Sequence, residues 1–160
     1  MQIAVVSDTH GHAEYARQAV RVLEGLEIGA VLHCGDIGTP GIVPLFDRWQ
    51  THFVFGNVDH DERRLRAEIE DAGQTCHGRF GRIDLEGRRI ALLHGNDIAL
   101  FEQTVSSGEW DLVCYGHTHF AKQEVVNGAL VLNPGALYRA RPHSFALVDL
   151  RTLKAEFVTL

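Results

Sequence analysis

The sequence predicts an α/β fold, a four-layer α/β/β/α sandwich in which two mixed sheets are flanked by helices. Strand-like and helix-like segments alternate along the first half of the chain, as in βα units. Short strand-like segments separated by turn residues dominate the second half, as in antiparallel hairpins. With 160 residues, of which 45% are hydrophobic, the chain is long and apolar enough to bury one core. We therefore expect a single domain over residues 1–160.

The first half predicts three strands that each run into a polar loop before a helix. We expect strands at residues 2–6, 30–34 and 52–55, and helices at 13–26, at 39–48 and from the loop near residue 60 to about residue 72. Apolar residues keep helical spacing in the first helix, and Gly29 follows its end. Thr39 and Pro40 suit the N-cap and first turn of the second helix, and Gly73 suits the end of the third.

The second half predicts hairpins around one further helix. We expect strands at residues 80–85, 88–93, 112–115, 123–126, 130–132, 145–150 and 153–158, and a helix at 97–106. Glu86-Gly87 and Asn127-Gly128 are dipeptides of the kind that close hairpins. We expect the strands of the tail to form a meandering antiparallel sheet.

Charge and composition exclude several classes of protein. A net charge of −6, with Lys122 and Lys154 as the only lysines, argues against a surface for duplex nucleic acid, which needs clustered cations. The opening residues lack the basic start of a signal peptide, and no apolar run reaches the length of a membrane span. We therefore expect a cytoplasmic protein that does not bind membranes. Cys34, Cys76 and Cys114 are odd in number and widely spaced, which indicates neither a disulfide framework nor a zinc knuckle.

Metal-capable side chains follow five of the predicted strands. They are Asp8, His10, Asp36, Asn57, His94, His117 and His119. Because ligands gather at the carboxyl ends of strands in α/β sheets, we expect these side chains to converge. Residues two apart in an extended chain point to one side, which groups Asp8 with His10 and His117 with His119. Oxygen and imidazole ligands suit manganese, iron, zinc, cobalt or nickel, and seven ligands are too many for one ion, so we expect two ions that share one carboxylate.

Taken singly, these motifs also fit ordinary structural roles. Asp8 suits a helix cap, Gly35-Asp36 and Gly56-Asn57 are common turn dipeptides, and a lone histidine is usually a hydrogen-bonded, half-buried residue. Their recurrence at strand ends is what favours metal chemistry. His33 lies within a strand and is interpreted as a core residue. The remaining histidines without a functional interpretation are His52, His77 and His143.

The motifs together resemble the signature of the calcineurin-like metallophosphoesterase superfamily. They are Asp8-x-His10, Gly35-Asp36, Gly56-Asn57, His94-Gly95 and Gly116-His117-x-His119. Asn133-Pro134-Gly135 is similar to the tail motif of its small single-domain prokaryotic phosphodiesterase branch. The resemblance implies that one metal ion is held by Asp8, His10, Asp36 and His119, and the other by Asp36, Asn57, His94 and His117. Asp36 would bridge two divalent transition-metal ions, with manganese expected first and iron, zinc, nickel or cobalt also compatible.

The sequence departs from the wider superfamily at Val58, where that superfamily carries a histidine thought to assist the leaving group. The small phosphodiesterase branch often lacks this histidine, so the departure agrees with the branch and leaves the general acid open. Asp59 and His60 are the nearest substitutes, and His12 is a further candidate for a proton donor or substrate contact; both histidines also fit exposed loop positions. Arg139 and Arg141 suit either a substrate phosphate or the surface.

These observations predict a dinuclear metal-dependent phosphoesterase that hydrolyses a small phosphodiester by in-line attack of a metal-bound hydroxide. The chain has no Gly-x-Ser-x-Gly elbow, P-loop or Cys-x5-Arg loop to supply a different phosphate chemistry. The alternative is a protein-interaction scaffold on the same fold, as in the subunit of the retromer coat that resembles this family. A DNA nuclease is disfavoured by the acidic balance. The oligomeric state stays open.

Overall fold

The computed structural model describes residues 1–160, which form eleven strands, three α-helices and one 3-10 helix. In chain order these are β1 (Gln2–Val6), α1 (Ala13–Leu23), β2 (Ile28–His33), η1 (Pro40–Phe46), β3 (Gln50–Phe53), α2 (Glu62–Asp71), β4 (Thr75–Cys76), β5 (Phe80–Leu85), β6 (Arg88–Leu93), α3 (Ile98–Ser106), β7 (Leu112–Cys114), β8 (Ala121–Val126), β9 (Ala129–Pro134), β10 (Ser144–Asp149) and β11 (Lys154–Thr159). None of the three α-helices has both the length and the apolar character that a membrane crossing demands.

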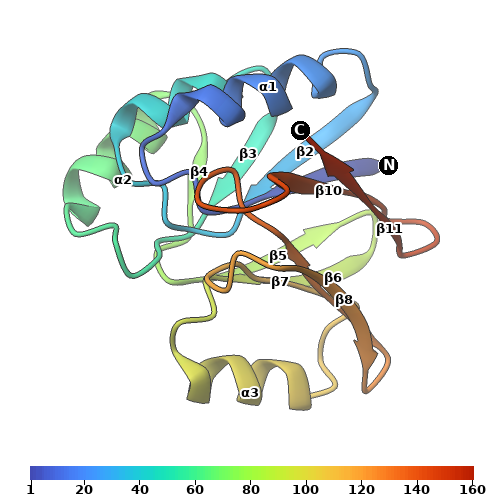
Figure 1. The fold of residues 1–160 in the computed structure, drawn as a ribbon. Helices are drawn as coiled ribbons and strands as arrows, with labels where there is room; N and C mark the ends of the chain where they lie inside the picture. Colours follow the sequence, from blue (N-terminus) through green and yellow to red (C-terminus); the bar gives the residue numbers. More distant parts are fainter.

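Two mixed sheets are stacked face to face, as Figure 1 shows. The first has the strand order β11-β10-β1-β2-β3-β4, with β1 to β4 parallel and β10 antiparallel to β1. The second has the order β5-β6-β7-β9-β8, with a parallel centre and antiparallel edge strands. Helices α1 and α2 cover the outer face of the first sheet, and α3 covers that of the second (Figure 1). The predicted α/β/β/α sandwich is confirmed.

Alternating side chains of the central strand β1 separate two hydrophobic layers. Ala4 and Val6 pack among residues of α1 and η1, whereas Ile3 and Val5 pack between the sheets, where they meet β6, β7 and β9. A third cluster joins the second sheet to α3. All four of these β1 side chains are fully buried. Strands buried on both faces need apolar residues at consecutive positions, which explains the unbroken Ile3-Ala4-Val5-Val6 run.

Several predicted boundaries are wrong, and the errors have local causes. The expected helix at 39–48 is a 3-10 helix over Pro40–Phe46, in which Pro44 has no N–H for an α-helical bond and Thr39 makes no side-chain cap. The first helix ends at Leu23 rather than Leu26, and Gly29 lies within β2. The short strand β4 was not predicted.

The tail does not form one meander. The hairpin β8–β9 belongs to the second sheet, where β9 runs parallel to β7, whereas β10–β11 belongs to the first sheet beside β1. The residues after Pro134 therefore carry the chain from one sheet to the other. The hairpin turns are as expected, because Glu86-Gly87 and Asn127-Gly128 both have positive φ at their two central residues.

His33, the last residue of β2, is a fully buried polar junction between two loops. Its Nδ1 accepts the N–H of Gly35 at 3.2 Å, and its Nε2 lies 3.1 Å from the hydroxyl of Thr9 in the loop after β1. Its ring also stacks on Phe53, with centroids 5.4 Å apart. The interpretation of His33 as a core residue is confirmed. Burial lowers its pKa to about 4, because the charged form would be desolvated and Nδ1 already accepts a hydrogen bond.

We predict that acid weakens folding through His33. The pKa of His33 is about 6.5 in the unfolded chain and about 4 in the folded protein. As pH falls between these values, the unfolded chain is protonated at His33 and the folded protein is not. The free energy of unfolding of chelator-treated protein should therefore fall over this window, by up to about 3 kcal/mol from this residue. Urea unfolding at several pH values measures it. The variant His33→Asn should show a shallower pH dependence than wild type; identical slopes would contradict the assignment.

Candidate metal centre

The loops that follow β1, β2 and β7 turn by means of left-handed residues. Five of the seven predicted ligands have positive φ: Asp8 (56°), His10 (47°), Asp36 (52°), His117 (67°) and His119 (61°). The expectation that Asp8 and His10 share one side of an extended chain is therefore wrong, since both lie outside the extended region. Non-glycine residues in this region cost about 1–3 kcal/mol each and persist where the surroundings impose them, typically at functional sites.

Glycines let these loops approach one another. A Cβ on Gly56 would collide with Oδ1 of Asp36 and lie 2.5 Å from its backbone nitrogen, and a Cβ on Gly116 would lie 2.6 Å from Oδ2 of Asp8. The φ of Gly56 is not left-handed, so glycine is needed there only because the Asp36 loop lies too close for a side chain. Gly35, before Asp36, has a φ of 94°, and a Cβ on it would lie 2.9 Å from the backbone nitrogen of Gly56. The sequence-based explanation of the glycines before Asp36 and Asn57 is thus supported.

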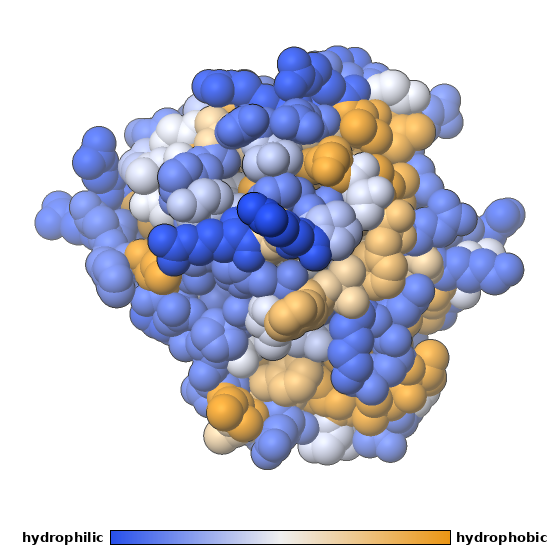
Figure 2. Space-filling model, in the orientation of Figure 1, coloured by the Kyte–Doolittle hydropathy of each residue, from blue (hydrophilic) through white to orange (hydrophobic).

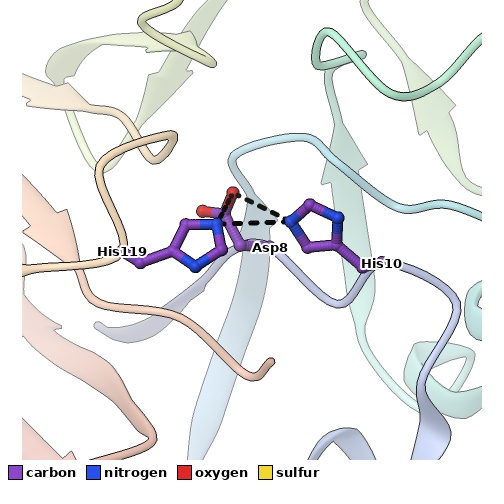
Figure 3. Close-up of side chains that lie close together, drawn as sticks. All are labelled: Asp8, His10 and His119. Atoms are coloured by element: carbon purple, nitrogen blue, oxygen red, sulfur yellow. Dashed lines mark hydrogen bonds and ion pairs between the residues drawn. The ribbon is translucent and has the colours of Figure 1, made fainter. Parts of the chain in front are cut away.

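Asp8, His10 and His119 form the first group of converging side chains (Figure 3). Oδ1 of Asp8 lies 3.7 Å from Nε2 of His10 and 3.2 Å from Nε2 of His119. The two Nε2 atoms are 3.3 Å apart. Figure 3 shows the two rings facing the carboxylate from either side. The residues come from loops 109 positions apart in sequence, after β1 and β7.

Asp36 joins this group to a second one. Its Oδ2 lies 3.5 Å from Nε2 of His10 and 3.3 Å from Nε2 of His94. Nε2 of His94 is in turn 3.1 Å from Oδ1 of Asn57. Asp8, Asp36 and His94 offer ligand atoms that all lie within 4.8 Å of one another. One carboxylate oxygen of Asp36 therefore faces both groups.

His117, like Asn57, is an exposed member of the predicted ligand set. Its side chain is exposed, and its ring centroid is 5.2 Å from that of His94. Its backbone N–H donates to Oδ2 of Asp8 at 3.1 Å. His117 thus lies at the rim beside the second group and makes no direct contact with either carboxylate through its side chain.

Hydrogen bonds on the outer side fix the inner atoms of the cluster. His94 donates from Nδ1 to the carbonyl of Cys34 at 2.8 Å, and His119 donates from Nδ1 to the carbonyl of Arg139 at 3.2 Å. These bonds leave Nε2 of each ring as the inward atom. Oδ2 of Asp8 accepts from Ser7 and from His117, while its Oδ1 is buried without a hydrogen-bond partner. An orphaned carboxylate oxygen among inward imidazole nitrogens is the donor set of a divalent cation.

The electrostatics of the cluster attract positive charge. Burial acts to raise the pKa of Asp8 and of Asp36, but the neighbouring histidines outweigh burial and hold both pKa values below the ordinary range. Asp8 raises the pKa of His119, and Asp36 raises that of His94 although burial acts to lower it. Both carboxylates are therefore ionised at neutral pH, and protons compete with any cation for the rings.

The candidate proton donors lie at different places. His12 stacks on Tyr138 with centroids 3.7 Å apart, and the Tyr138 ring lies 5.7 Å from that of His10. His60 is exposed, and only its backbone is bonded, to the carbonyl of Val58. Asp59 is buried, and its carboxylate accepts three backbone N–H groups, those of Ile37, Gly38 and Gly56. Asp59 therefore clamps the two loops and is not free to donate a proton.

Sequence reasoning missed the roles of three positioning residues. Ser7 holds Asp8 by a 2.6 Å hydrogen bond, and Tyr138 supports His12. Asn133 was singled out by resemblance alone; its amide donates to the carbonyl of Gly116 and to Thr118, so it holds the loop that carries the last two histidines. No periodicity or spacing signal marks these contacts, because those of Tyr138 and Asn133 join segments distant in the chain and that of Ser7 depends on the left-handed turn at Asp8.

The histidines without a predicted function lie away from the cluster. His52 and His77 face each other, with Nδ1 and Nε2 3.0 Å apart, and His143 stacks on Tyr15. Cys34 and Cys114 are buried, and burial raises the pKa of both thiols.

The chain is similar to known phosphoesterases in both sequence and structure. Residues 1–153 match the profile of the calcineurin-like phosphoesterase superfamily domain. A phosphodiesterase of Methanocaldococcus jannaschii is 29% identical over 138 residues, which cover 84% of this chain and 83% of that protein. The structure of an archaeal phosphodiesterase aligns over 100% of this chain and 100% of its own, with 26% sequence identity and a TM-score of 0.93.

The fold also occurs in a protein that is named for vacuolar sorting and not as a phosphoesterase. Vacuolar protein sorting 29 of Cryptosporidium parvum is 23% identical, with a TM-score of 0.71, over 99% of this chain and 96% of that one. At this identity the likeness concerns the fold alone. The family profile, in contrast, spans almost the whole chain and confirms the resemblance seen in the motifs. The chain belongs to the calcineurin-like phosphoesterase superfamily and is a metal-dependent phosphoesterase.

Proposed function

We propose that this protein is a dinuclear phosphodiesterase that hydrolyses a small phosphodiester by in-line displacement with water. The observation that carries the proposal is the position of Asp36 Oδ2, 3.5 Å from Nε2 of His10 and 3.3 Å from Nε2 of His94. One divalent cation would be held by Asp8, His10, Asp36 and His119, and a second by Asp36, Asn57, His94 and His117. Manganese is the first expectation, and iron, zinc, nickel or cobalt suit the same ligands.

Two divalent cations at such a site bind phosphoryl oxygens, lower the pKa of water and offset developing negative charge. The chain contributes the charges that hold them together, because two ionised carboxylates reduce the repulsion between two cations. The outer bonds from His94 and His119 to backbone carbonyls keep their rings oriented without rearrangement.

The buried hydroxyls and thiols near the cluster are not suited to be the nucleophile, which supports water in that role. The hydroxyl of Ser7 is buried and donates to Asp8, and that of Thr9 is buried and bonded to the carbonyl of Ile37. The thiols of Cys34 and Cys114 are buried, and their raised pKa values keep them protonated.

The scaffold alternative rests on likeness of fold alone. A protein-interaction surface needs neither ionised carboxylates buried together nor left-handed backbone at Asp8, His10 and Asp36, both of which cost folding free energy. These costs are explained if the loops serve to hold cations. That residues 1–160 suffice as one catalytic domain stays a prediction.

The central test is metal content together with the variant Asp36→Ala. Wild type reconstituted with manganese should contain two ions per chain by elemental analysis. Asp36→Ala takes a ligand from both ions and should lower diesterase activity by at least about 100-fold, since cation stabilisation is worth several kcal/mol. Asp84→Ala, on the exposed side of β5, is the matched control. A ceiling of one ion, or near-normal turnover in Asp36→Ala, would reject the shared carboxylate.

A second prediction concerns the close approach at Gly56. In Gly56→Ala the new methyl group collides with the Asp36 carboxylate, so metal content should drop and the free energy of unfolding should fall by about 1–3 kcal/mol. Gly41→Ala is a matched control, because nothing lies within 4 Å of the Cβ it would add. Elemental analysis and urea unfolding measure both effects. Wild-type metal content in Gly56→Ala would show that the loops have more room than the structure indicates.

A third prediction is preference for diesters over monoesters. The name of the Methanocaldococcus jannaschii relative supports a diester substrate. On one manganese-loaded sample, bis(p-nitrophenyl) phosphate should be hydrolysed with a higher kcat/KM than p-nitrophenyl phosphate. Faster cleavage of the monoester would overturn the assignment.

A fourth prediction concerns Val58, whose side chain has no proton to give a departing oxygen. Because general acid catalysis contributes about 10² to 10⁴-fold, the wild-type rate should fall steeply as the pKa of the leaving group rises. Val58→His should speed alkyl esters selectively and flatten this dependence. If His12 or His60 already donates the proton, His12→Ala or His60→Ala should slow alkyl esters instead. A series of leaving groups distinguishes these outcomes; a flat wild-type dependence with chemistry rate-limiting would contradict the lack of an acid.

A further inference from the structure

A groove of about 440 Å³ opens directly beside the candidate metal centre. It is lined by His119 and Phe120 from the loop before β8, and by Arg139, Ala140 and Arg141 from the loop before β10. His119 belongs to both places, since its Nε2 faces Asp8 while its ring forms part of the groove wall. Small-molecule sites have volumes of about 300–1,000 Å³, so the groove has room for one arm of a diester.

Phe120 is the most exposed large hydrophobic side chain of the molecule, at 77%. The face drawn in Figure 2 is predominantly hydrophilic, with hydrophobic residues in separate patches. An aromatic ring left in water forgoes the stabilisation that burial of its apolar surface would give. A ligand that covers the ring would recover this free energy, and a planar ligand ring would add stacking.

The two arginines of the groove are available for an anion. Neither Arg139 nor Arg141 forms an ion pair with a carboxylate. The guanidinium carbon of Arg139 lies 5.3 Å from the ring centroid of Tyr138, and its backbone carbonyl binds His119. The backbone contact anchors Arg139 beside the cluster, and its guanidinium over Tyr138 belongs to a residue that lines the groove, where it can pair with a phosphoryl oxygen.

We propose that this groove binds a nucleoside-sized arm of the diester, with its planar ring stacked on Phe120 and its phosphoryl group paired with Arg139. This inference rests on the proposed phosphodiesterase function and names the class of its substrate. An exposed aromatic ring beside unpaired arginines is the combination that binds bases of single-stranded nucleic acid. The volume and the net charge of −6 limit the ligand to nucleotide size rather than a polymer.

The test compares diesters with one leaving group and different second arms. We would measure kcat/KM for p-nitrophenyl esters of thymidine 5′-phosphate, hexyl phosphate and ethyl phosphate, using the manganese-loaded full chain. Wild type should prefer the thymidine ester to both others. Phe120→Ala should lower the thymidine-to-ethyl ratio by about 5-fold to 150-fold, the contribution of stacking one base on an aromatic ring. Phe120→Trp should retain the preference.

Arg139→Gln should lower kcat/KM for all three esters in similar proportion, since they share the phosphoryl group. Val125→Ala, an exposed apolar residue of β8 outside the groove, should behave as wild type. An unchanged ratio in Phe120→Ala, or an equal preference for the hexyl ester, would overturn the planar-ring assignment. The assignment would also be overturned if Phe120→Ala lowered kcat/KM equally for all three esters while Arg139→Gln left kcat/KM unchanged.

Direct binding separates this proposal from the function on which it rests. Titration calorimetry with thymidine 5′-monophosphate on metal-free protein should show binding that Phe120→Ala weakens at least 5-fold. If wild type hydrolyses no diester, the proposed function fails. The difference in affinity between wild type and Phe120→Ala then decides by itself whether the groove binds a nucleoside. Equal affinity of wild type and Phe120→Ala, or no binding by wild type, would reject the nucleoside site even if diesters are hydrolysed.

Discussion

The rest of the structure depends on the burial of two ionised carboxylates, Asp8 and Asp36, side by side at the ends of β1 and β2. Ionised groups are rarely buried without partners, because removing them from water costs several kcal/mol each. Here one oxygen of each carboxylate accepts hydrogen bonds from the chain. Oδ2 of Asp8 accepts from the Ser7 hydroxyl and the His117 N–H, and Oδ1 of Asp36 accepts from the N–H of Val58. The other oxygen of each faces imidazole nitrogens. The residual negative charge is what makes the site select cations.

This arrangement is held by the loops rather than by the strands that precede them. The strands bring the loops to one edge of the stacked sheets, but the ligand directions come from left-handed residues and from glycines that permit contact between loops. Buried polar side chains then tie neighbouring loops together. His33 joins the loops after β1 and β2, Asp59 joins those after β2 and β3, and Asn133 holds the loop after β7. Each clamp is fully committed to hydrogen bonds, as a rigid buried network requires.

The succession of most helices and strands along the chain, and the convergence of the polar loops after them, were predictable from sequence, because both depend on local patterns. Apolar runs locate the strands, and polar motifs directly after them locate the carboxyl edge of the sheets. Apart from the element boundaries, whose errors have local causes, the features that the sequence did not predict depend on distant contacts. The apolar pattern of the tail identifies two hairpins but not the sheet that each joins, since β10 pairs with β1 at the other end of the chain. The positive φ of Asp8 and His10 has no local signal either, because surrounding loops impose it. Asp59 was a candidate proton donor because its hydrogen bonds to the loop after β2 also have no local signal.

The carbonyl of Arg139 connects the two halves of the proposed site. It fixes the ring of His119, while the side chain of the same residue lies over Tyr138 at the groove. The geometry of the cluster and the shape of the groove therefore share one loop, residues 135–143. A side-chain substitution at this position changes the groove but keeps the carbonyl, so substrate preference can vary without loss of the cluster. A change of backbone conformation there would disturb both, since Arg139 has a φ of 50° that the loop must impose. On this argument, side chains of the loop tune specificity, and its backbone is constrained by the metal centre.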